Sequence, residues 1–173
     1  MNWLGRIISK EIKEEDKVLD LGCGIMQATM YTLEPDRIKC KLVVGVDAYE
    51  PYIKRISNIE NVVAIHAFTE DIIDGFMDKS FDIVIALDFL EHLEECEIDV
   101  IVGEMERIAR KKVIIYTPKE FKKQDTLNPY GMGENELQQH KSLIKDEWLI
   151  RKGYTIYYPQ ESGNILAIKE MGQ

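Results

Sequence analysis

The chain has 173 residues, 45% of them hydrophobic, and a formal net charge of −9, which are the size and composition of one ordinary globular domain. Its longest mainly apolar run, residues 81–90, is too short and too acidic to span a bilayer, and no continuous apolar segment of a signal peptide opens the chain. The acidic balance also disfavours nucleic acid, because a duplex-binding protein usually carries a basic face. The two dense basic runs, residues 107–112 and 119–123, are interpreted as a solvated helix end and a loop.

The cysteines indicate a reducing compartment. Cys23, Cys40 and Cys96 are odd in number and show no close pairing pattern, so we expect a cytoplasmic protein. The chain has no C-x-x-C pair, which argues against a cysteine zinc site.

Helical and strand patterns alternate along the chain. Residues 1–16 place apolar side chains at helical spacing and predict an amphipathic helix packed on the domain. Strands are expected at residues 17–21, 41–47, 61–67, 80–87 and 112–117. Helices are expected between them at residues 25–33, 51–57 and 91–110. The fourth strand is a continuous apolar run, which indicates a central position buried on both faces.

The rhythm breaks at residues 118–133, a mostly polar stretch with two prolines and two glycines. A helix is expected over residues 134–152, stopped by Gly153, and the last two strands, 154–159 and 164–169, form a hairpin around a four-residue turn. The sequence therefore predicts a single α/β domain over residues 1–173. It has a doubly wound, mostly parallel seven-stranded sheet, an antiparallel C-terminal hairpin and helices on both faces. Ligands of such sheets bind beyond the carboxyl ends of the strands.

The stretch VLDLGCG, residues 18–24, points to a nucleotide-like ligand. Gly22 and Gly24 follow the first strand and permit a tight turn close to a bound group, and Asp47 ends the next strand, where an acid accepts hydrogen bonds from ribose hydroxyls. The dinucleotide fingerprint has a third glycine where this chain has Gln27, and Asp20 would oppose a pyrophosphate. An acid suits a cation, and S-adenosylmethionine carries a sulfonium and an ammonium. An NAD-dependent oxidoreductase is thereby disfavoured.

The sequence resembles the class I S-adenosylmethionine-dependent methyltransferases. VLDLGCG is similar to their first motif, GVDAYEPYI (residues 45–53) to the second, TEDI (69–72) to the adenine segment and SFDIVIALDFLEHL (80–93) to the fourth strand and its loop. The resemblance implies that the cofactor is bound by Asp20, Gly22, Cys23, Gly24, Met26, Asp47, Ala48, Asp71, Ile72 and Leu87. Met26 stands where the family usually has a third glycine, so it either lines or crowds the methionine end of the cofactor. A second interpretation of Asp71 is a helix N-cap.

Acidic and histidine residues follow the fourth strand. Asp88, Glu91 and His92 are spaced to converge near a helix start, although capping and dipole effects also explain these residue types there. DFLEH is similar to the E-x-x-E-H segment of some class I O-methyltransferases, including ubiquinone-pathway enzymes and small-RNA 3′-end 2′-O-methyltransferases. In the RNA enzymes those side chains and a later histidine hold a divalent cation.

By that resemblance the metal ligands, for Mg or Mn, are Asp88, Glu91, His92 and His140, and the catalytic residues are His92, Glu91 and His140. Asp88 has a shorter arm than the glutamate of those enzymes. Residues 118–137 are expected to form an acceptor lid, with polar contacts from Asn128, Tyr130, Gln138 and His140 and an apolar one from Met132.

The resulting interpretation is an S-adenosylmethionine-dependent methyltransferase that acts on an oxygen or nitrogen of a small-molecule or carbohydrate-like acceptor. Two alternatives stay open: a metal-assisted RNA 2′-O-methyltransferase, and a non-catalytic scaffold on the same fold, for which Met26 is the motive. The short chain leaves the pocket to be shaped by the lid and the N-terminal helix, alone or with a second subunit of a homodimer.

Overall fold

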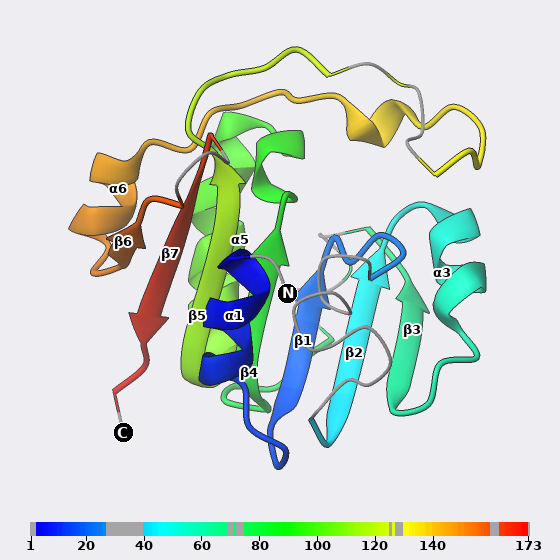
Figure 1. Cartoon of the computed structure of the whole chain (residues 1–173), viewed down its shortest axis with the longest axis horizontal. Helices are drawn as coiled ribbons and strands as arrows, with labels where there is room; N and C mark the ends of the chain where they lie inside the picture. The colour runs from blue at the N-terminus through cyan, green and yellow to red at the C-terminus, as the bar shows by residue number, and fades with distance from the viewer. Residues whose placement is uncertain are drawn as a thin grey trace.

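The computed structural model describes residues 3–26, 40–68, 71, 75–124, 126, 130–159 and 163–172. Within them seven strands form one sheet, in the order β3-β2-β1-β4-β5-β7-β6 (Figure 1). The strands are β1 (Lys17–Leu21), β2 (Leu42–Asp47), β3 (Val62–His66), β4 (Phe81–Leu87), β5 (Ala109–Pro118), β6 (Thr155–Tyr157) and β7 (Asn164–Glu170). The first five are parallel, and β7 runs antiparallel between β5 and β6. The predicted sheet and its reversed C-terminal hairpin are confirmed.

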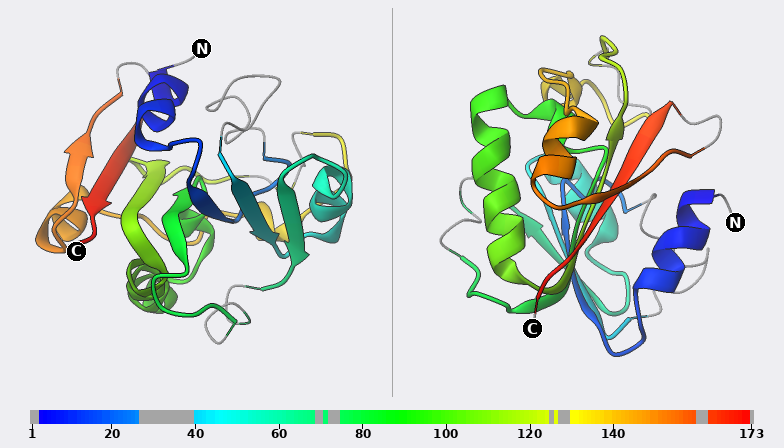
Figure 2. Two further views of the ribbon diagram at one scale, coloured as in Figure 1. Left: turned by 90° about the horizontal axis from the view of Figure 1, so that it is seen from below. Right: turned by 90° about the vertical axis from the view of Figure 1, so that its left-hand side faces the viewer.

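Helices cover both faces of the sheet, as predicted. In the edge-on view of Figure 2, α5 (Glu95–Ile108) and α6 (Asp146–Arg151) lie on one side and α1 (Trp3–Glu11) on the other. Ile101 and Met105 of α5 pack with one set of strand residues, and Ile8 of α1 and Ile53 of α3 (Glu50–Ile56) pack with the other. Successive residues of a strand point to opposite faces, so a single strand serves both cores.

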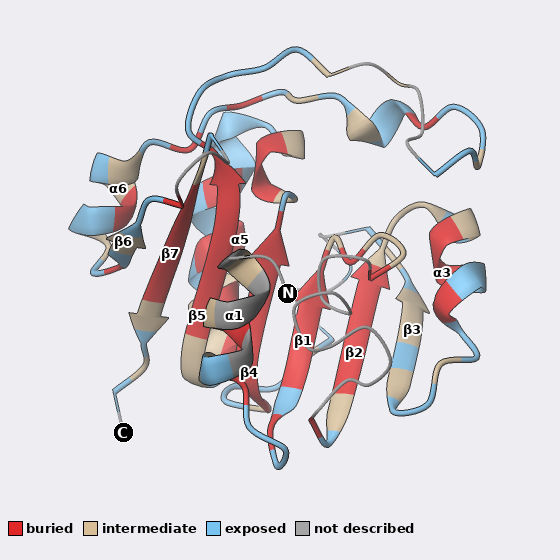
Figure 3. Ribbon diagram, viewed as in Figure 1, coloured by how far each residue is buried: buried red, intermediate tan, exposed pale blue. Residues whose placement is uncertain are grey.

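The central strand is the most deeply buried. All seven residues of β4 are buried, and its visible parts are red in Figure 3, whereas β3 at the sheet edge is half-buried to exposed. The continuous apolar run correctly predicts burial on both faces. The helix expected at residues 51–57 is confirmed as α3. Of the helix expected at 25–33, Ile25 and Met26 lie in a turn, and the remainder falls outside the described residues.

The single helix expected over residues 91–110 is wrong. The chain forms a short 3-10 turn, η1 (Leu90–His92), leaves helical geometry at Leu93 and begins α5 only at Glu95. Glu94 and Glu97 make a reciprocal capping box at this second start, which satisfies N–H groups that a continuous helix would have paired internally. β5 also begins earlier than predicted, at Ala109.

The helix expected over residues 134–152 is also wrong. It is replaced by a 3-10 turn, η2 (Glu136–Gln138), an extended stretch, and the six-residue α6. In the extended stretch the N–H groups of Lys141 and Ser142 donate to the carbonyl of Glu91, at 2.8 and 3.1 Å. These long-range hydrogen bonds replace the i to i−4 bonds of a helix. Gly153, in the left-handed region with φ +91°, ends α6 as predicted.

The two edges of the sheet differ in character. At the amino ends of the parallel strands, the buried carboxylates of Asp16 and Asp82 pair with Lys111, and Asp82 also pairs with Arg110. At the carboxyl ends, the described parts of residues 119–144 run from β5 toward α3 and back (Figure 1). In the described part of the chain, no helix has the length and apolar character needed to cross a membrane.

Candidate active site

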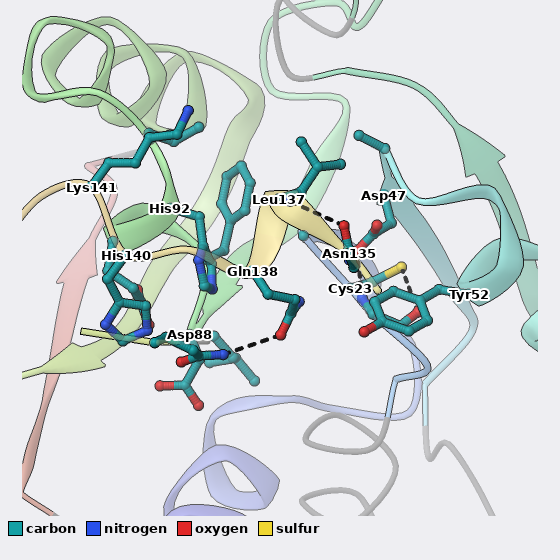
Figure 4. Close-up of a pocket in the computed structure, with 18 of the residues that line it drawn as sticks. Cys23, Asp47, Tyr52, Asp88, His92, Asn135, Leu137, Gln138, His140 and Lys141 are labelled. Carbon is teal, nitrogen blue, oxygen red and sulfur yellow. Dashed lines mark hydrogen bonds between the residues drawn. The ribbon is translucent and has the colours of Figure 1, made fainter. Parts of the chain in front are cut away.

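A cavity of about 610 Å³ opens at the carboxyl ends of β1, β2 and β4, beneath the segment that crosses them. Its volume lies within the range of small-molecule and cofactor sites. Figure 4 shows its two ends, with Cys23, Asp47 and Tyr52 at one and Asp88, His92 and His140 at the other. This is the position that the open-sheet rule predicts for a ligand.

The turn after β1 exposes its backbone to the cavity. Gly22 and Gly24 adopt φ +63° and +54°, the left-handed region that glycine enters without strain. A Cβ at Gly22 would come within 2.2 Å of the ring of Phe89, whereas a Cβ at Gly24 would meet nothing within 4 Å. Gly22 is therefore required by packing. Gly24 leaves free space on the cavity wall, where a ligand can approach the main chain.

Asp47 at the end of β2 is fixed by the main chain. One carboxylate oxygen accepts from the N–H of Gly24 at 2.8 Å, and the other from the N–H of Tyr49 at 2.8 Å. Burial raises the pKa of this carboxyl, and the two backbone N–H donors counter the rise. An ionised carboxylate has about four acceptor positions, so Asp47 retains capacity for further donors such as ribose hydroxyls.

The other predicted cofactor residues fall into two groups. Cys23, Ala48 and Leu87 line the cavity together with Gly22, Gly24 and Asp47. Asp20 is buried, Asp71 is exposed, and neither lines the cavity. Asp71 lies in a helical position, where its N–H donates to the carbonyl of Phe68. Ile72 lies outside the described residues.

Met26 lies in the core. Its side chain is fully buried and packs with Ile8, Val43 and Ile83 on the α1 face of the sheet. It does not line the cavity, so neither of the two roles considered for it at the methionine end of the cofactor is seen.

Glu91, His92 and His140 converge at the other end of the cavity. Each offers one ligand atom, and these atoms lie within 4.8 Å of one another. The two imidazole rings meet edge to face, with centroids 5.0 Å apart. His92 Nδ1 lies 3.1 Å from the carbonyl of Gln139, which fixes that nitrogen as the donor and leaves Nε2 as the acceptor. Three of the four predicted metal ligands thus meet in one place.

Glu91 is the most confined of the three. It is 2% exposed, and its Oε2 accepts from the hydroxyl of Thr117 at 3.0 Å. Its Oε1 is buried and has no hydrogen-bond partner among the described residues. Burial, followed by the charge of Asp88, raises the pKa of Glu91 to about 8. Burial lowers the pKa of His92 and of His140, so both imidazoles are neutral at pH 7.

Asp88 lies beside this group without joining it. Its carboxylate accepts from the amide of Asn164 at 3.0 Å, and its backbone is held in the left-handed region, with φ +50°, by an N–H bond to the carbonyl of Tyr116. Surrounding protein displaces water from the carboxylate and raises its pKa to about 6, although the residue as a whole is exposed. The shorter arm noted in the sequence is consistent with this separation.

The expected lid residues partly line the cavity. Tyr130, Gln138 and His140 do so, Met132 does not, and Asn128 is outside the described residues. Sequence reasoning missed the attachment of this segment to α3: the hydroxyl of Tyr49 donates to the carbonyl of Met132 at 2.7 Å. The rings of Tyr49 and Tyr52 meet edge to face, as do those of Tyr52 and Tyr130.

Thr117, Asn164 and Tyr49 are the site residues for which the sequence predicted no role. Thr117 and Asn164 stand at the ends of β5 and β7, where strand ends meet the cavity. Strand position is therefore the signal that could have singled out these two residues. Tyr49 lies within the motif GVDAYEPYI, which marks its position but does not predict its hydrogen bond to Met132.

Comparison with solved structures supports the fold. A protein of Pyrococcus horikoshii, PH0226, superposes with a TM-score of 0.67 at 24% identity, covering 98% of this chain and 88% of that one. An S-adenosylmethionine-dependent methyltransferase from Aquifex aeolicus gives a TM-score of 0.61 at 18% identity, covering 97% and 89%. The 1,6-didemethyltoxoflavin-N1-methyltransferase of Burkholderia thailandensis, solved with 1,6-didemethyltoxoflavin and S-adenosylhomocysteine, gives 0.68 at 16% identity, covering 98% and 77%.

No curated protein sequence matches the chain. A family model does: the one described as a methyltransferase domain matches residues 19–117, more than half of the chain. This match includes the turn after β1, Asp47 and the Glu91–His92 pair. The chain therefore belongs to the methyltransferase domain family, in the class I, S-adenosylmethionine-dependent group that its motifs predict.

Proposed function

We propose that this protein transfers the methyl group of S-adenosylmethionine to an oxygen or nitrogen atom of a small-molecule or carbohydrate-like acceptor. The observation that carries the proposal is the continuity of one cavity from Gly24 and Asp47 to Glu91, His92 and His140. Residues 118–137 act as the acceptor lid above it. A neighbour of the same fold, the 1,6-didemethyltoxoflavin-N1-methyltransferase with bound 1,6-didemethyltoxoflavin, supports the small-molecule substrate class by analogy.

The residues at the cofactor end of the cavity are chemically suited to S-adenosylmethionine. Gly24 leaves space for close approach to its backbone, and the N–H groups of Gly24 and Tyr49 hold Asp47 in place. Asp47 would accept hydrogen bonds from the ribose hydroxyls. Ala48 and Phe68 line the cavity and would give the adenine an apolar wall. When bound, S-adenosylmethionine supplies an activated methyl group, so the chain's task is alignment of the acceptor more than activation of the donor.

The acceptor end fits a divalent cation. One carboxylate oxygen of Glu91 and one nitrogen from each of two neutral imidazoles form a set of one oxygen and two nitrogen donors. Oε1, which has no hydrogen-bond partner among the described residues, is the oxygen that we assign to the ion. Imidazole nitrogen suits Fe²⁺ and Zn²⁺, and carboxylate oxygen suits Mn²⁺ and Mg²⁺, so the mixed set favours Mn²⁺, Fe²⁺ or Zn²⁺ over Mg²⁺. When bound, such an ion lowers the pKa of an acceptor hydroxyl. Glu91, His92 and His140 would hold it, with Asp88 beside them and not in the coordination sphere.

The same residues give the chain a proton acceptor near the reacting atom. In the absence of an ion, His140 would be this acceptor: it lines the cavity, and its lowered pKa keeps it unprotonated at pH 7. A general base of this kind contributes on the order of 10²–10⁴ in rate. Glu91, His92 and His140 are accordingly the catalytic residues of the proposal.

An RNA acceptor is the weaker candidate. The convergence of Glu91, His92 and His140 favours it, but the basic run at residues 107–112 lies at the opposite edge of the sheet and is paired with acids. Arg107 pairs with Asp78 and Glu104, and Lys112 pairs with Glu11 and Glu170. A steep salt dependence of RNA binding would favour this alternative, because phosphate neutralisation releases counterions.

The position of Met26 removes the reason for considering a non-catalytic scaffold. It rested on Met26 closing the cofactor site, whereas Met26 lies in the core and the cavity is open beside Gly24. The homodimer prediction is a separate question that light scattering after size exclusion would test.

Calorimetric titration tests the proposal. Purified protein is titrated with S-adenosylmethionine and with S-adenosylhomocysteine, with and without Mn²⁺ and Mg²⁺, and then screened for methyl transfer to hydroxyl- and amine-bearing small molecules. Micromolar cofactor binding followed by turnover that Mn²⁺ enhances is the expected result. Turnover indifferent to chelator would remove the ion and leave His140 as the base. Failure to bind either cofactor would contradict the proposal as a whole.

A further inference from the structure

The side chain of Thr117 contacts Glu91 on the side of the carboxyl group that faces away from the cavity. It is the residue before the last of β5, its side chain is fully buried, and its Oγ1 donates to Glu91 Oε2 at 3.0 Å. It lies at a strand end that faces the carboxyl edge of the sheet, yet it does not line the cavity. It therefore acts on the cavity through Glu91 and not directly.

This hydrogen bond makes the two carboxyl oxygens of Glu91 different from each other. A hydroxyl has one proton to donate, so Thr117 satisfies Oε2 and leaves Oε1 buried and without a partner among the described residues. A buried carboxyl group with one oxygen left without a partner either costs free energy or keeps its proton, unless a ligand meets that oxygen. The main chain of Glu91 is held as well, by the N–H groups of Lys141 and Ser142.

We propose that Thr117 is a positioning residue that makes Glu91 a one-oxygen ligand, with Oε1 presented to the ion that His92 and His140 share. The inference rests on the metal site of the proposed function. Its consequence is geometric: Oε2 already accepts from Thr117, so Oε1 is the open ligand atom and the hydrogen bond disfavours binding of an ion through both oxygens. Three single-atom protein ligands then leave the remaining coordination positions to the acceptor or to water.

Titration of the full-length protein with Mn²⁺ alone, and with Co²⁺ alone as a spectroscopic probe, tests this role. Thr117→Val keeps the shape and removes the hydroxyl, and we expect it to weaken ion affinity about 10–100-fold, as loss of a partner hydrogen-bonded to a metal ligand does. Thr117→Ser restores the hydroxyl and should restore the affinity. Ser80→Ala, which removes a buried hydroxyl just before β4 at the opposite end of the strands, should bind the ions as wild type does.

S-Adenosylhomocysteine affinity is measured on every variant and should not change, because that end of the cavity is untouched. Wild-type affinity in Thr117→Val, or a Thr117→Ser variant as weak as the valine, would overturn the positioning role while leaving the metal site standing. A wild-type protein that binds S-adenosylhomocysteine and neither ion would overturn the metal site and this inference together, and leave the methyltransferase intact.

Discussion

The methyl group of Met26 fills the space where a side chain on Gly45 would stand. A Cβ at Gly45 would come within 2.3 Å of Met26 Cε and 2.9 Å of Cys23 Sγ. Met26 is fully buried, with φ +56°, and Gly45 lies in β2 next to it. The departure from the family's third glycine is thus matched by a glycine on the neighbouring strand.

This pairing predicts non-additive effects on stability. Met26→Ala should lower the free energy of unfolding by about 2–5 kcal/mol through the cavity it leaves, and Gly45→Ala by about 1–3 kcal/mol through overpacking. The double variant should lose less than the sum, because each change makes room for the other. Denaturant unfolding of the four proteins measures the coupling. Strict additivity would contradict the pairing, and a large loss of S-adenosylhomocysteine affinity in Met26→Ala would place Met26 at the cofactor after all.

Asp47 is predicted to carry cofactor affinity. Asp47→Asn keeps the size but removes the charge, and loss of hydrogen bonds to a charged acceptor costs about 1.5–3 kcal/mol, or roughly 10–100-fold in Kd for S-adenosylhomocysteine. Glu50→Gln, an exposed acid three residues along the chain that pairs with Lys54, is the matched control and should bind as wild type does. Equal affinities in the two variants would show that Asp47 does not meet the ribose.

His140 is predicted to act in turnover and not in cofactor binding. His140→Ala should lower kcat by about 10²–10⁴-fold, the contribution of a positioned acid–base group, and should also weaken Mn²⁺ binding. His66→Ala is a suitable control, because that imidazole lies next to Ala48 at the cofactor end and not in the cluster. If His140→Ala turned over normally with a saturating acceptor, the catalytic role would be wrong.

The hydroxyl of Tyr49 should hold the lid. Tyr49→Phe removes the hydrogen bond to the Met132 carbonyl and keeps the ring packing against Tyr52. The expected loss is about 0.5–1.5 kcal/mol, seen as faster amide exchange at residues 130–138 and slightly weaker acceptor binding. Exchange mass spectrometry reports the change directly. Unaltered exchange in that segment would mean that the lid is held by other contacts.

The ion pairs at the amino edge predict a pH dependence of stability. Burial alone would raise the pKa of Asp82, but hydrogen bonds from the Lys17 N–H and from the Arg110 and Lys111 side chains outweigh it, so the pKa lies below its ordinary 3.8. The folded state therefore favours the ionised form. The stabilisation is fully present above about pH 4 and is lost as the pH falls through the folded-state pKa.

Asp82→Asn should cost about 1.5–3 kcal/mol at pH 7 and flatten the acid limb of the stability curve. Asp78→Asn, at the exposed partner of Arg107, is the control and should cost no more than about 1 kcal/mol. Urea unfolding at pH 3 to 7 measures both. If the stability of Asp82→Asn fell as steeply with decreasing pH as that of wild type, another carboxylate would be the source of the pH dependence.

Local sequence patterns predicted the strands well, because a strand buried on both faces of the sheet is encoded as a continuous apolar run. The seven buried residues of β4 appear in the sequence as one apolar run, and Asp47 appears as the acid that ends the next strand. The cofactor end could be predicted for the same reason: glycines and an acid at strand ends are local features.

The errors lie where distant segments decide the structure. Residues 139–145 have helical composition, yet the Glu91 carbonyl takes two of their N–H groups and holds them extended. Met26 could not be placed without Gly45, nor Asp88 without Asn164 and the Tyr116 carbonyl. Each of these contacts joins residues far apart in the chain, and no periodicity records them.

The hydrogen bonds from Lys141 and Ser142 to the Glu91 carbonyl also determine when the site forms during folding. Glu91 and His140 are separated by a long loop whose closure must be paid for in chain entropy before the cluster exists. Cofactor-end contacts, made between adjacent strands β1 and β2, require shorter closures. A refolding chain should therefore become competent for S-adenosylhomocysteine before it becomes competent for an ion, and the appearance of Co²⁺ absorbance would time the last step of assembly.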